Sequence, residues 1–514
     1  MQTKQTKMKI ISLVICITLI GKVLGLGRDM LLGQSFGTGY TADALMAASL
    51  IPRQFFDVVF AGAISASFIP ILNDILQKEG KGAAVRLTSS FCNLVGLISF
   101  CFSLLGIVFA PQIIAATANF APETQALAVD LLRIIFPSLF FTGLAFSMVG
   151  FLQSFGSFHM PAAISAFSNA VMIAYLLFFV ERFGVYGAAV AMLISWIVQA
   201  VVLLPAMHKR GFSYQLSFWH PAMRQIGRLV LPVMLSTWVL PINMLVVLRF
   251  ASGITGGASS IGFANSLYLM IAGIFVLSVT NVVFPDLSRL SGEKDKKEFA
   301  ALIRKTTETL LFFLIPMTVG LMLMATPLVR LLYERQEFTA ESTILTASAL
   351  VHLSVGMVGF GLFQLFTRVF YAQKRGRPPI VAGLVGILAN GILCALFVSA
   401  MGVAGLGLAS GISLMIATLV LCVPTHRNLE GGLCSASFFG KIGKMILSAF
   451  LMAVVVFFLR NALENVLEDG FFGRLLLLFV PAIFGAITYF FFAYVLQLEQ
   501  LQFLREKLGR KGAA

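Results

Sequence analysis

The fold class is decided by stretches such as residues 87–113, which read LTSSFCNLVGLISFCFSLLGIVFAPQI and contain no Asp, Glu, Lys or Arg. A helix crosses a bilayer with about 20 mostly apolar residues, so this stretch predicts a membrane span. The whole chain shares its character: 59% of the 514 residues are hydrophobic and 11% are charged, against about 25% charged in soluble domains. We therefore expect an all-α polytopic membrane protein, and not a soluble, disordered or disulfide-stapled chain.

Reading between charge clusters and Gly or Pro residues predicts fourteen spans. They lie near residues 8–35, 43–74, 87–113, 124–154, 160–181, 186–207, 225–251, 260–288, 301–330, 342–372, 378–400, 403–424, 440–462 and 472–498. An even number of spans puts both termini on one side, where the connecting segments hold 27 Lys and Arg residues against six on the other side. Because basic loops stay in the cytoplasm, both termini are expected on the cytoplasmic side of an inner or plasma membrane.

The chain repeats itself at an offset of 218 residues. Gly184-Val185-Tyr186-Gly187 recurs as Gly402-Val403-Ala404-Gly405, and Phe120 and His208 recur as Phe338 and His426. Each copy holds six helices, so the copies have the same topology and form two pseudo-symmetric lobes related by an axis along the membrane normal. We expect an N-lobe at 1–215, a C-lobe at 216–430, and a C-terminal helix pair with a basic tail at 431–514. Two such lobes predict an alternating-access transporter with a central cavity.

Charged residues inside the predicted spans gather in the N-lobe. Each costs about 2.5–3.5 kcal/mol on insertion scales, which makes it a candidate functional residue. The first span carries Lys22, Arg28 and Asp29, so two cations share one nearby acid, and Gly25 and Gly27 could bend the helix to turn Arg28 inward. An excess of positive charge suits an anionic ligand, and guanidinium forks suit pyrophosphate.

Other charges in the N-lobe are open to a structural reading. Arg53 and Asp57 of the second span are four residues apart and can pair along one helix face, which fits either a site or the packing of the lobe. The corresponding spans of the C-lobe have polar residues instead, among them Asn265 and Ser266.

Three motifs in the first 75 residues resemble the MurJ/MviN family of lipid II flippases, part of a larger exporter superfamily. They are GKVLGLGRD at 21–29, FGTGYTADA at 36–44 and GAISASFIP at 62–70. The resemblance implies two six-helix lobes with two further C-terminal helices that form a groove for the lipid tail. It also implies a function: translocation of the undecaprenyl-pyrophosphate-linked peptidoglycan precursor from the inner to the outer leaflet, by alternating access through a cationic cavity. No bond is made or broken, so the protein would not be an enzyme.

The resemblance assigns Lys22 and Arg28 to the family's cationic cavity, with Lys22 where an Arg is usual, and Asp43 to its outer acidic position. The chain departs from the pattern where Phe56 and Ser266 stand in place of two arginines, although Arg53 lies one turn before Phe56. The candidate substrate-binding residues are Lys22, Arg28, Asp29, Asp43, Arg53, Asp57, Asn265 and Ser266.

No cofactor is expected. The sequence has no Gly-x-x-x-x-Gly-Lys-Ser/Thr motif for ATP, so the membrane potential is the simpler energy source. Sodium coupling occurs in the family, and Asn243 and Asn390 are weak sodium candidates. The histidines show no metal-binding spacing. Expected partners are a lipid-linked substrate, membrane lipids and cell-wall synthesis proteins, without nucleic acid.

Alternative functions remain open because Phe56 and Ser266 stand where the family pattern has arginines. A flippase for another polyprenyl-linked glycan shares the fold and the chemistry. A drug or cation antiporter of the same superfamily would favour acidic cavity residues, which Lys22 and Arg28 argue against. A scaffold that has lost transport is also compatible with Ser266 in place of an arginine.

Overall fold

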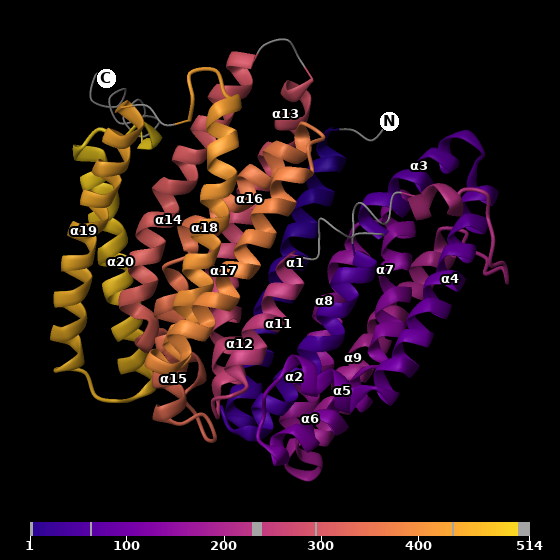
Figure 1. Ribbon diagram of the computed structural model, residues 1–514, viewed down its shortest axis with the longest axis horizontal. Helices are drawn as coiled ribbons and strands as arrows, with labels where there is room; N and C mark the ends of the chain where they lie inside the picture. Colours follow the sequence, from indigo (N-terminus) through magenta and orange to yellow (C-terminus); the bar gives the residue numbers. More distant parts are fainter. Residues whose placement is uncertain (1–3, 62–63, 229–238, 293–295, 434–435, 502–514) are drawn as a thin grey trace. The chain divides into compact units, whose positions relative to one another are not determined.

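The computed structural model describes residues 4–61, 64–228, 239–292, 296–433 and 436–501, and these residues form helices without strands (Figure 1). Nine of the described helices are long and apolar enough to cross a membrane, and two bent helix pairs raise the number to eleven. The other three predicted spans fall on α1 (Lys4–Phe36), on α2 (Tyr40–Phe56), and on α11 (Val239–Ala251) together with residues 229–238, which lie outside the described residues. The expected all-α, multi-pass membrane fold is confirmed.

Packing divides the chain into two compact units, Met1–Ser259 with Arg335–Phe338, and Ser260–Glu334 with Thr339–Ala514. The first unit contains α1, α2, η1 (Asp57–Ala61), η2 (Ile64–Phe68), α3 (Ile69–Lys78), α4 (Lys81–Val108), α5 (Ala110–Thr117), α6 (Pro122–Ile135), α7 (Ser138–Ser154), α8 (His159–Phe178), α9 (Val180–Lys209) and α11. The predicted lobes divide at 215/216 because the repeat does. The packing boundary falls later, since Arg249 of α11 donates to the carbonyls of Ala115 and Ala118.

The second unit begins inside α12 (Gly257–Tyr268), whose first residues belong to the first unit. It continues through η3 (Leu269–Gly273), α13 (Ile274–Ser291), α14 (Lys296–Tyr333), α15 (Ala340–Ser354), α16 (Met357–Ala372), α17 (Arg377–Met401), α18 (Val403–Asn428), α19 (Ala436–Glu464), α20 (Phe471–Val495) and η4 (Glu499–Leu501). The predicted basic tail, Arg505 to Lys511, lies outside the described residues.

Both units carry the same backbone feature at the repeated glycines. Gly184 has φ 53° and ψ −145°, and Gly402 has φ 58° and ψ −131°, a left-handed conformation that only glycine adopts freely. The bent pairs also correspond: α6 and α7 meet at 40°, and α15 and α16 meet at 49°. Since α6 begins at Pro122 and α15 at Ala340, the bent pairs begin 218 residues apart, at the offset of the repeat. The internal duplication is therefore present in the backbone as well as in the sequence.

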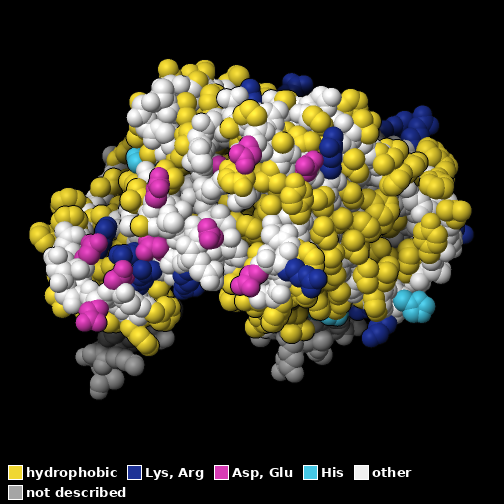
Figure 2. All heavy atoms as spheres, turned by 90° about the horizontal axis from the view of Figure 1, so that it is seen from below, with side chains coloured by type: hydrophobic (Ala, Val, Ile, Leu, Met, Phe, Trp, Pro, Cys, Tyr) yellow, Lys and Arg dark blue, Asp and Glu magenta, His cyan; other side chains and the backbone are white. Residues whose placement is uncertain are grey.

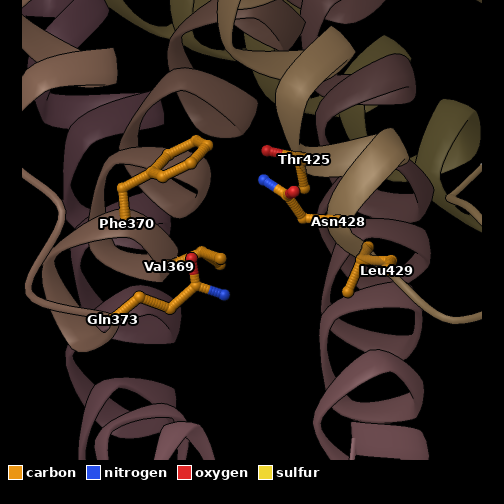
Figure 3. Close-up of a pocket in the computed structure, with 6 residues that line it drawn as sticks. All are labelled: Val369, Phe370, Gln373, Thr425, Asn428 and Leu429. Carbon is orange, nitrogen blue, oxygen red and sulfur yellow. The ribbon is translucent and has the colours of Figure 1, made fainter.

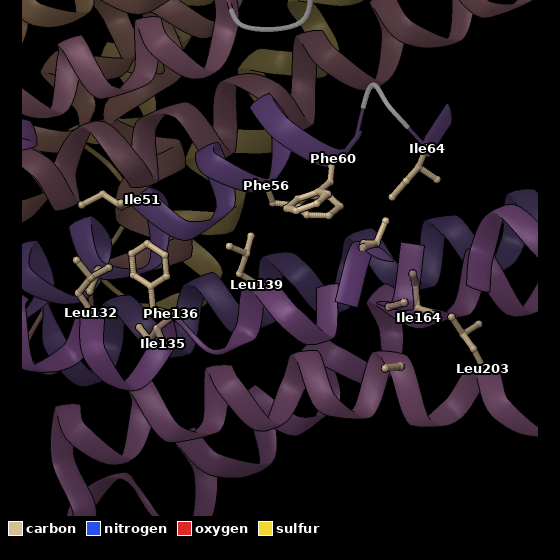
Figure 4. Packing of buried hydrophobic residues seen from close by; sticks show 14 of the residues in the cluster. Ile51, Phe56, Phe60, Ile64, Leu132, Ile135, Phe136, Leu139, Ile164 and Leu203 are labelled. Atoms are coloured by element: carbon tan, nitrogen blue, oxygen red, sulfur yellow. The ribbon is translucent and has the colours of Figure 1, made fainter. Parts of the chain in front are cut away.

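Apolar side chains, several phenylalanines among them, fill the core of the first unit (Figure 4). The rings of Phe68 and Phe91 stack with centroids 4.0 Å apart, and Phe136 is buried so closely against α4 that a Cβ on Gly106 would fall 2.2 Å from its ring. Lipid tails are as apolar as these side chains, so close van der Waals packing holds such helices together more than burial from water does.

The C-terminal helix pair packs on α14 of the second unit. The hydroxyl of Tyr489 in α20 donates to the carbonyl of Phe312 at 2.6 Å. One turn away on α14, Glu308 pairs with Lys441 of α19 at 3.0 Å, and Lys441 also pairs with Glu499 of η4 at 2.8 Å. These contacts fix one end of the pair to α14, in agreement with its place outside the six-helix repeat.

Candidate substrate-binding site in the first unit

The candidate cations of α1 lie on a helix that packs closely along α8. A Cβ added to Gly21 would be 2.5 Å from the Ser165 hydroxyl oxygen, and one added to Gly25 would be 3.3 Å from the Asn169 side-chain nitrogen. One helix, α1, runs from Lys4 to Phe36 through these glycines, so they do not interrupt it. These glycines instead let α8 approach, as small residues commonly do between membrane helices.

Arg28 is held by a network that joins α1 to α8. Its guanidinium donates to Asp29 Oδ1 from Nε at 3.0 Å and from Nη2 at 2.6 Å, and to Asn169 Oδ1 from Nη1 at 3.1 Å. Asn169 is buried and donates in turn to the Gly21 carbonyl at 3.0 Å. The positive charge of Arg28 is therefore matched by Asp29, although a third of the Arg28 side chain stays exposed.

Asn169 is a site residue that the sequence interpretation missed. It is an amide side chain in the otherwise apolar span 160–181, and a buried amide needs hydrogen-bond partners. This need for hydrogen-bond partners was the feature of the sequence that could have identified Asn169 as a site residue. Its partners could not be named from the sequence, because Arg28 and Gly21 lie more than 140 positions away.

Lys22 and Arg53 are the cations of the site that have no carboxylate partner. Both are exposed, and within the part of the chain that the structure describes neither has a carboxylate oxygen within 4.0 Å. The expected Arg53–Asp57 ion pair does not form there. The Asp57 N–H donates to the Arg53 carbonyl, so the two residues are one ordinary helical turn apart, and the charge of Arg53 acts on Asp57 only at longer range. Another cation of the predicted spans, Arg133, lies 3.6 Å from Asp130.

Phe56, which stands where the family usually has an arginine, is part of the hydrophobic core. It is 4% exposed, and its ring centroid lies 4.9 Å from that of Phe146 and 5.9 Å from that of Phe60. The departure from the family pattern is therefore accommodated by packing, and the unpaired cation of α2 is Arg53.

Asp43 binds the first turn of α12. Its carboxylate, 2% exposed, accepts from the Gly256 N–H at 2.7 Å, from the Ser259 N–H at 2.8 Å and from the Ser259 hydroxyl at 2.7 Å. Free N–H groups and the helix dipole favour a carboxylate at a helix N-terminus. Asp43 therefore holds a helix start within the first unit.

The remaining candidates lie on separate elements. Asn265 and Ser266 are partly buried on α12 within the second unit. Of the weak sodium candidates, Asn243 lies on α11 in the first unit and Asn390 is fully buried on α17 in the second. Among the described residues, no group of three His, Cys, Asp or Glu side chains is placed to hold a metal ion.

A small hollow in the second unit is lined by polar and apolar side chains from the ends of α16 and α18 (Figure 3). Its lining residues are Val369, Phe370, Gln373, Thr425, Asn428 and Leu429. About 180 Å³ of empty space is below the 300–1,000 Å³ usual for drug-sized ligands, so it is too small for a lipid-linked disaccharide.

A cluster of charged side chains lies in the second unit, near the connection between α19 and α20. Glu334 accepts from Arg330 at 3.2 Å, from Arg474 at 3.1 Å and from the Thr343 hydroxyl at 2.8 Å. Asp469 accepts from both arginines at 2.7 Å. Figure 2, which views this end of the molecule, shows acidic and basic side chains close together among hydrophobic ones. The cluster ties the loop of the C-terminal pair to α14.

This cluster should make the folded protein slightly less stable at acid pH. The hydrogen bond from Arg474, with the charge of Arg330, holds the pKa of the Asp469 carboxyl below its usual range. A depressed carboxyl pKa stabilises the folded state above the ordinary value near 4, and the contribution disappears as the pH falls through the lowered pKa. Between pH ~7 and pH ~3, the thermal unfolding temperature should fall more in the unmodified protein than in Asp469→Asn, by an amount worth at most about 1 kcal/mol. Parallel pH profiles for the two proteins would contradict this.

The duplicated helical fold defines the class of protein: a multi-pass membrane protein with an internal repeat. A multidrug resistance MATE-family transporter of the MOP superfamily, in an inward-facing conformation, shares this fold with a TM-score of 0.67 at 15% identity, covering 84% of this chain and 98% of the other. The sequence model of the lipid II flippase MurJ family matches residues 32–478, and the chain belongs to this family.

Individual relatives agree over nearly the full length. A probable lipid II flippase MurJ from Bdellovibrio bacteriovorus is 27% identical over 95% of this chain and 94% of its own length. The lipid II flippase MurJ of Thermosipho africanus is 29% identical over 79% of this chain and 82% of its own length. A solved structure of lipid II flippase MurJ in an inward closed conformation has a TM-score of 0.80 and 26% identity, covering 95% of this chain and 99% of the other.

Proposed function

We propose that this protein moves lipid II, the lipid-linked peptidoglycan precursor, from the inner to the outer leaflet of the membrane. The observation that carries the proposal is the family match over residues 32–478, within a chain that aligns with lipid II flippases over nearly its whole length. Because the protein belongs to a transporter family, it makes and breaks no covalent bond in the substrate.

The cations of the first unit supply the chemistry that such a substrate needs. Moving an ion into hydrocarbon costs on the order of 20 kcal/mol by the idealised Born estimate, so a pyrophosphate needs charged partners along its route. Exposed Lys22 and Arg53 have no carboxylate partner among the described residues, while Arg28 is oriented by Asp29 and Asn169. We assign Lys22, Arg28 and Arg53 to the pyrophosphate, and alternating access through a cationic cavity as the route.

The proposal also includes the energy source, the orientation in the membrane and the partners of the protein. The membrane potential, worth about 2.3 kcal/mol per charge per 100 mV, favours moving an anion out of a cell that is negative inside. The excess of Lys and Arg on one side supports cytoplasmic termini. Delivery of lipid II to the outer leaflet would serve the cell-wall synthesis proteins that consume it there.

Complementation tests the function. Expressed in bacteria depleted of their own lipid II flippase, the chain should restore growth, and in proteoliposomes it should expose lipid II faster under an imposed diffusion potential, inside negative for outward transfer. Failure of growth together with loss of another surface polymer on deletion would point to a different polyprenyl-linked glycan. Resistance to cationic drugs without complementation would indicate an antiporter and overturn the proposal.

A further inference from the structure

The segment after α9, residues 212–220, has no regular secondary structure and is bound along residues 89–93 of α4. We call it the linker segment. Asn93 of α4 donates to the carbonyls of Gln215 and Ser217 at 3.2 and 2.8 Å, and accepts from the Tyr214 hydroxyl at 2.8 Å. Ser90 donates to the Ser217 hydroxyl at 3.0 Å. Because its polar groups are bound to α4, the linker segment is fixed in one register.

That register leaves large apolar side chains exposed. Tyr214 is 62% exposed, Leu216 78%, Phe218 51% and Trp219 69%. Four such side chains within six residues form a patch that a water-exposed loop does not ordinarily maintain.

The patch adjoins a surface of α4 that faces lipid. Leu97, Phe100 and Leu104 follow Asn93 at the spacing of one helix face, and each is about half exposed in a helix that is long and apolar enough to span a membrane. The linker segment covers α4 at residues 89–93, one turn before this stripe begins. Its aromatic side chains therefore lie at the level where the membrane-facing surface ends.

The surroundings of the patch are basic. Residues 74–90 and 208–228 hold seven Lys and Arg residues against two acids, and one acid, Asp74, is paired with Lys78 at 2.8 Å. All seven cations are exposed: Lys78, Lys81, Arg86, Lys209, Arg210, Arg224 and Arg228. Arg224 and Arg228 belong to a short helical stretch, 223–228, that buries Met223 and Ile226 in the core of the first unit.

We propose that the linker segment is an interfacial anchor, whose aromatic side chains enter the headgroup region of the bilayer while the surrounding cations bind anionic phospholipid headgroups. Trp and Tyr favour this level because their rings are apolar at one end and polar at the other. Basic residues next to them are attracted to an anionic leaflet. Continuity with the stripe of α4 identifies a lipid surface as the occupant. This anchor does not depend on which lipid-linked molecule the protein moves.

Tryptophan fluorescence tests the anchor in the full-length protein, because the chain has only three tryptophans, Trp196, Trp219 and Trp238. The variant Trp196→Phe/Trp238→Phe keeps Trp219 and is reconstituted in vesicles of phosphatidylcholine and phosphatidylglycerol. Bromine atoms placed near the headgroup should quench Trp219 more than bromine atoms near the chain ends, and iodide in the water should quench it weakly. The matched control, Trp219→Phe/Trp238→Phe, keeps Trp196 in the middle of α9 and should show the opposite depth preference.

The charge requirement has its own measurement. At equal mole fraction, brominated phosphatidylglycerol should quench Trp219 about twofold more than brominated phosphatidylcholine. Adding Arg224→Gln/Arg228→Gln should bring that ratio close to one. A ratio of one without these substitutions would overturn the assignment to anionic headgroups. Free quenching by iodide with no effect of either brominated lipid would overturn the anchor, because a segment left open to water for a protein partner would behave in that way.

Discussion

Replacing Asp43 by alanine should abolish complementation and lower the thermal stability of the purified protein. The Asp43 carboxylate accepts hydrogen bonds from three donors on Gly256 and Ser259. Alanine leaves these donors without their acceptor in a buried place, at about 1–3 kcal/mol for each unsatisfied group. We expect a total loss of about 3 kcal/mol or more, because the start of α12 also loses a negative charge that its dipole favours.

Graded substitutions separate the carboxylate from its surroundings. Ser259→Ala removes one donor and keeps two backbone donors, so it should cost only about 1 kcal/mol. Asp43→Asn keeps an acceptor oxygen and should fall between Ser259→Ala and Asp43→Ala. Asp74→Ala is the matched control, since that exposed acid forms only a surface pair with Lys78 and should change stability by under about 1 kcal/mol. Equal unfolding temperatures for Asp43→Ala and Ser259→Ala would contradict the assigned role.

Replacing Arg28 by alanine should reduce lipid II transport about 30-fold, with complete loss of complementation when Lys22 is replaced as well. Without the guanidinium, Asp29, whose side chain is 14% exposed, loses its cation, and a neutral ion pair becomes a single negative charge. Truncating one partner of a hydrogen-bonded charge pair costs about 2–5 kcal/mol, and the partial exposure of Arg28 puts its cost at the lower end. Arg28→Lys keeps the charge but not the fork that binds Asp29 and Asn169, so partial activity is expected.

Two further variants determine what the Arg28 network does. Asn169→Ala should lower transport less than Arg28→Ala, because it keeps the charge and removes only the bond that orients it. Arg133→Ala is the matched control, an arginine of the same unit with a weaker partner at 3.6 Å, and should complement normally. Expression of the double variant Lys22→Ala/Arg28→Ala is checked by immunoblot. If this variant is expressed normally and still restores growth, these cations do not bind the substrate.

Much of the architecture was predictable from the sequence because it follows from local properties. Apolar length predicts a span wherever it occurs, and eleven predicted spans coincide with long helices or bent pairs of the described chain. The repeat predicted equivalent breaks, and Gly184 and Gly402 have matching backbone angles. Apolar length depends on residues that are close together in the chain, and the repeat depends on a fixed offset. Both can therefore be detected in the sequence alone.

The partners of the charged residues were not predictable in the same way. Spacing suggested an Arg53–Asp57 pair, but their side chains form no ion pair among the described residues, although the two residues are one ordinary helical turn apart. Arg28 and Asp29 are adjacent and so project about 100° apart around α1, yet the long arginine side chain reaches its neighbour while also reaching α8. Side-chain length and conformation decide such contacts, and the resulting partners do not follow from position along the chain.

By itself the sequence determined that the chain is a helical membrane protein with a duplicated half, that cations lie in its first span, and that it resembles the lipid II flippases. Composition, hydropathy and motifs carry that information directly. Only the tertiary structure decided which charges are free and which are bound: Arg28 is neutralised and oriented, Lys22 and Arg53 have no carboxylate partner among the described residues, and Asp43 holds the start of α12. The physical reason is that hydrogen bonds and ion pairs act over about 3–4 Å in space, between residues that can be 141 or 216 positions apart in the chain.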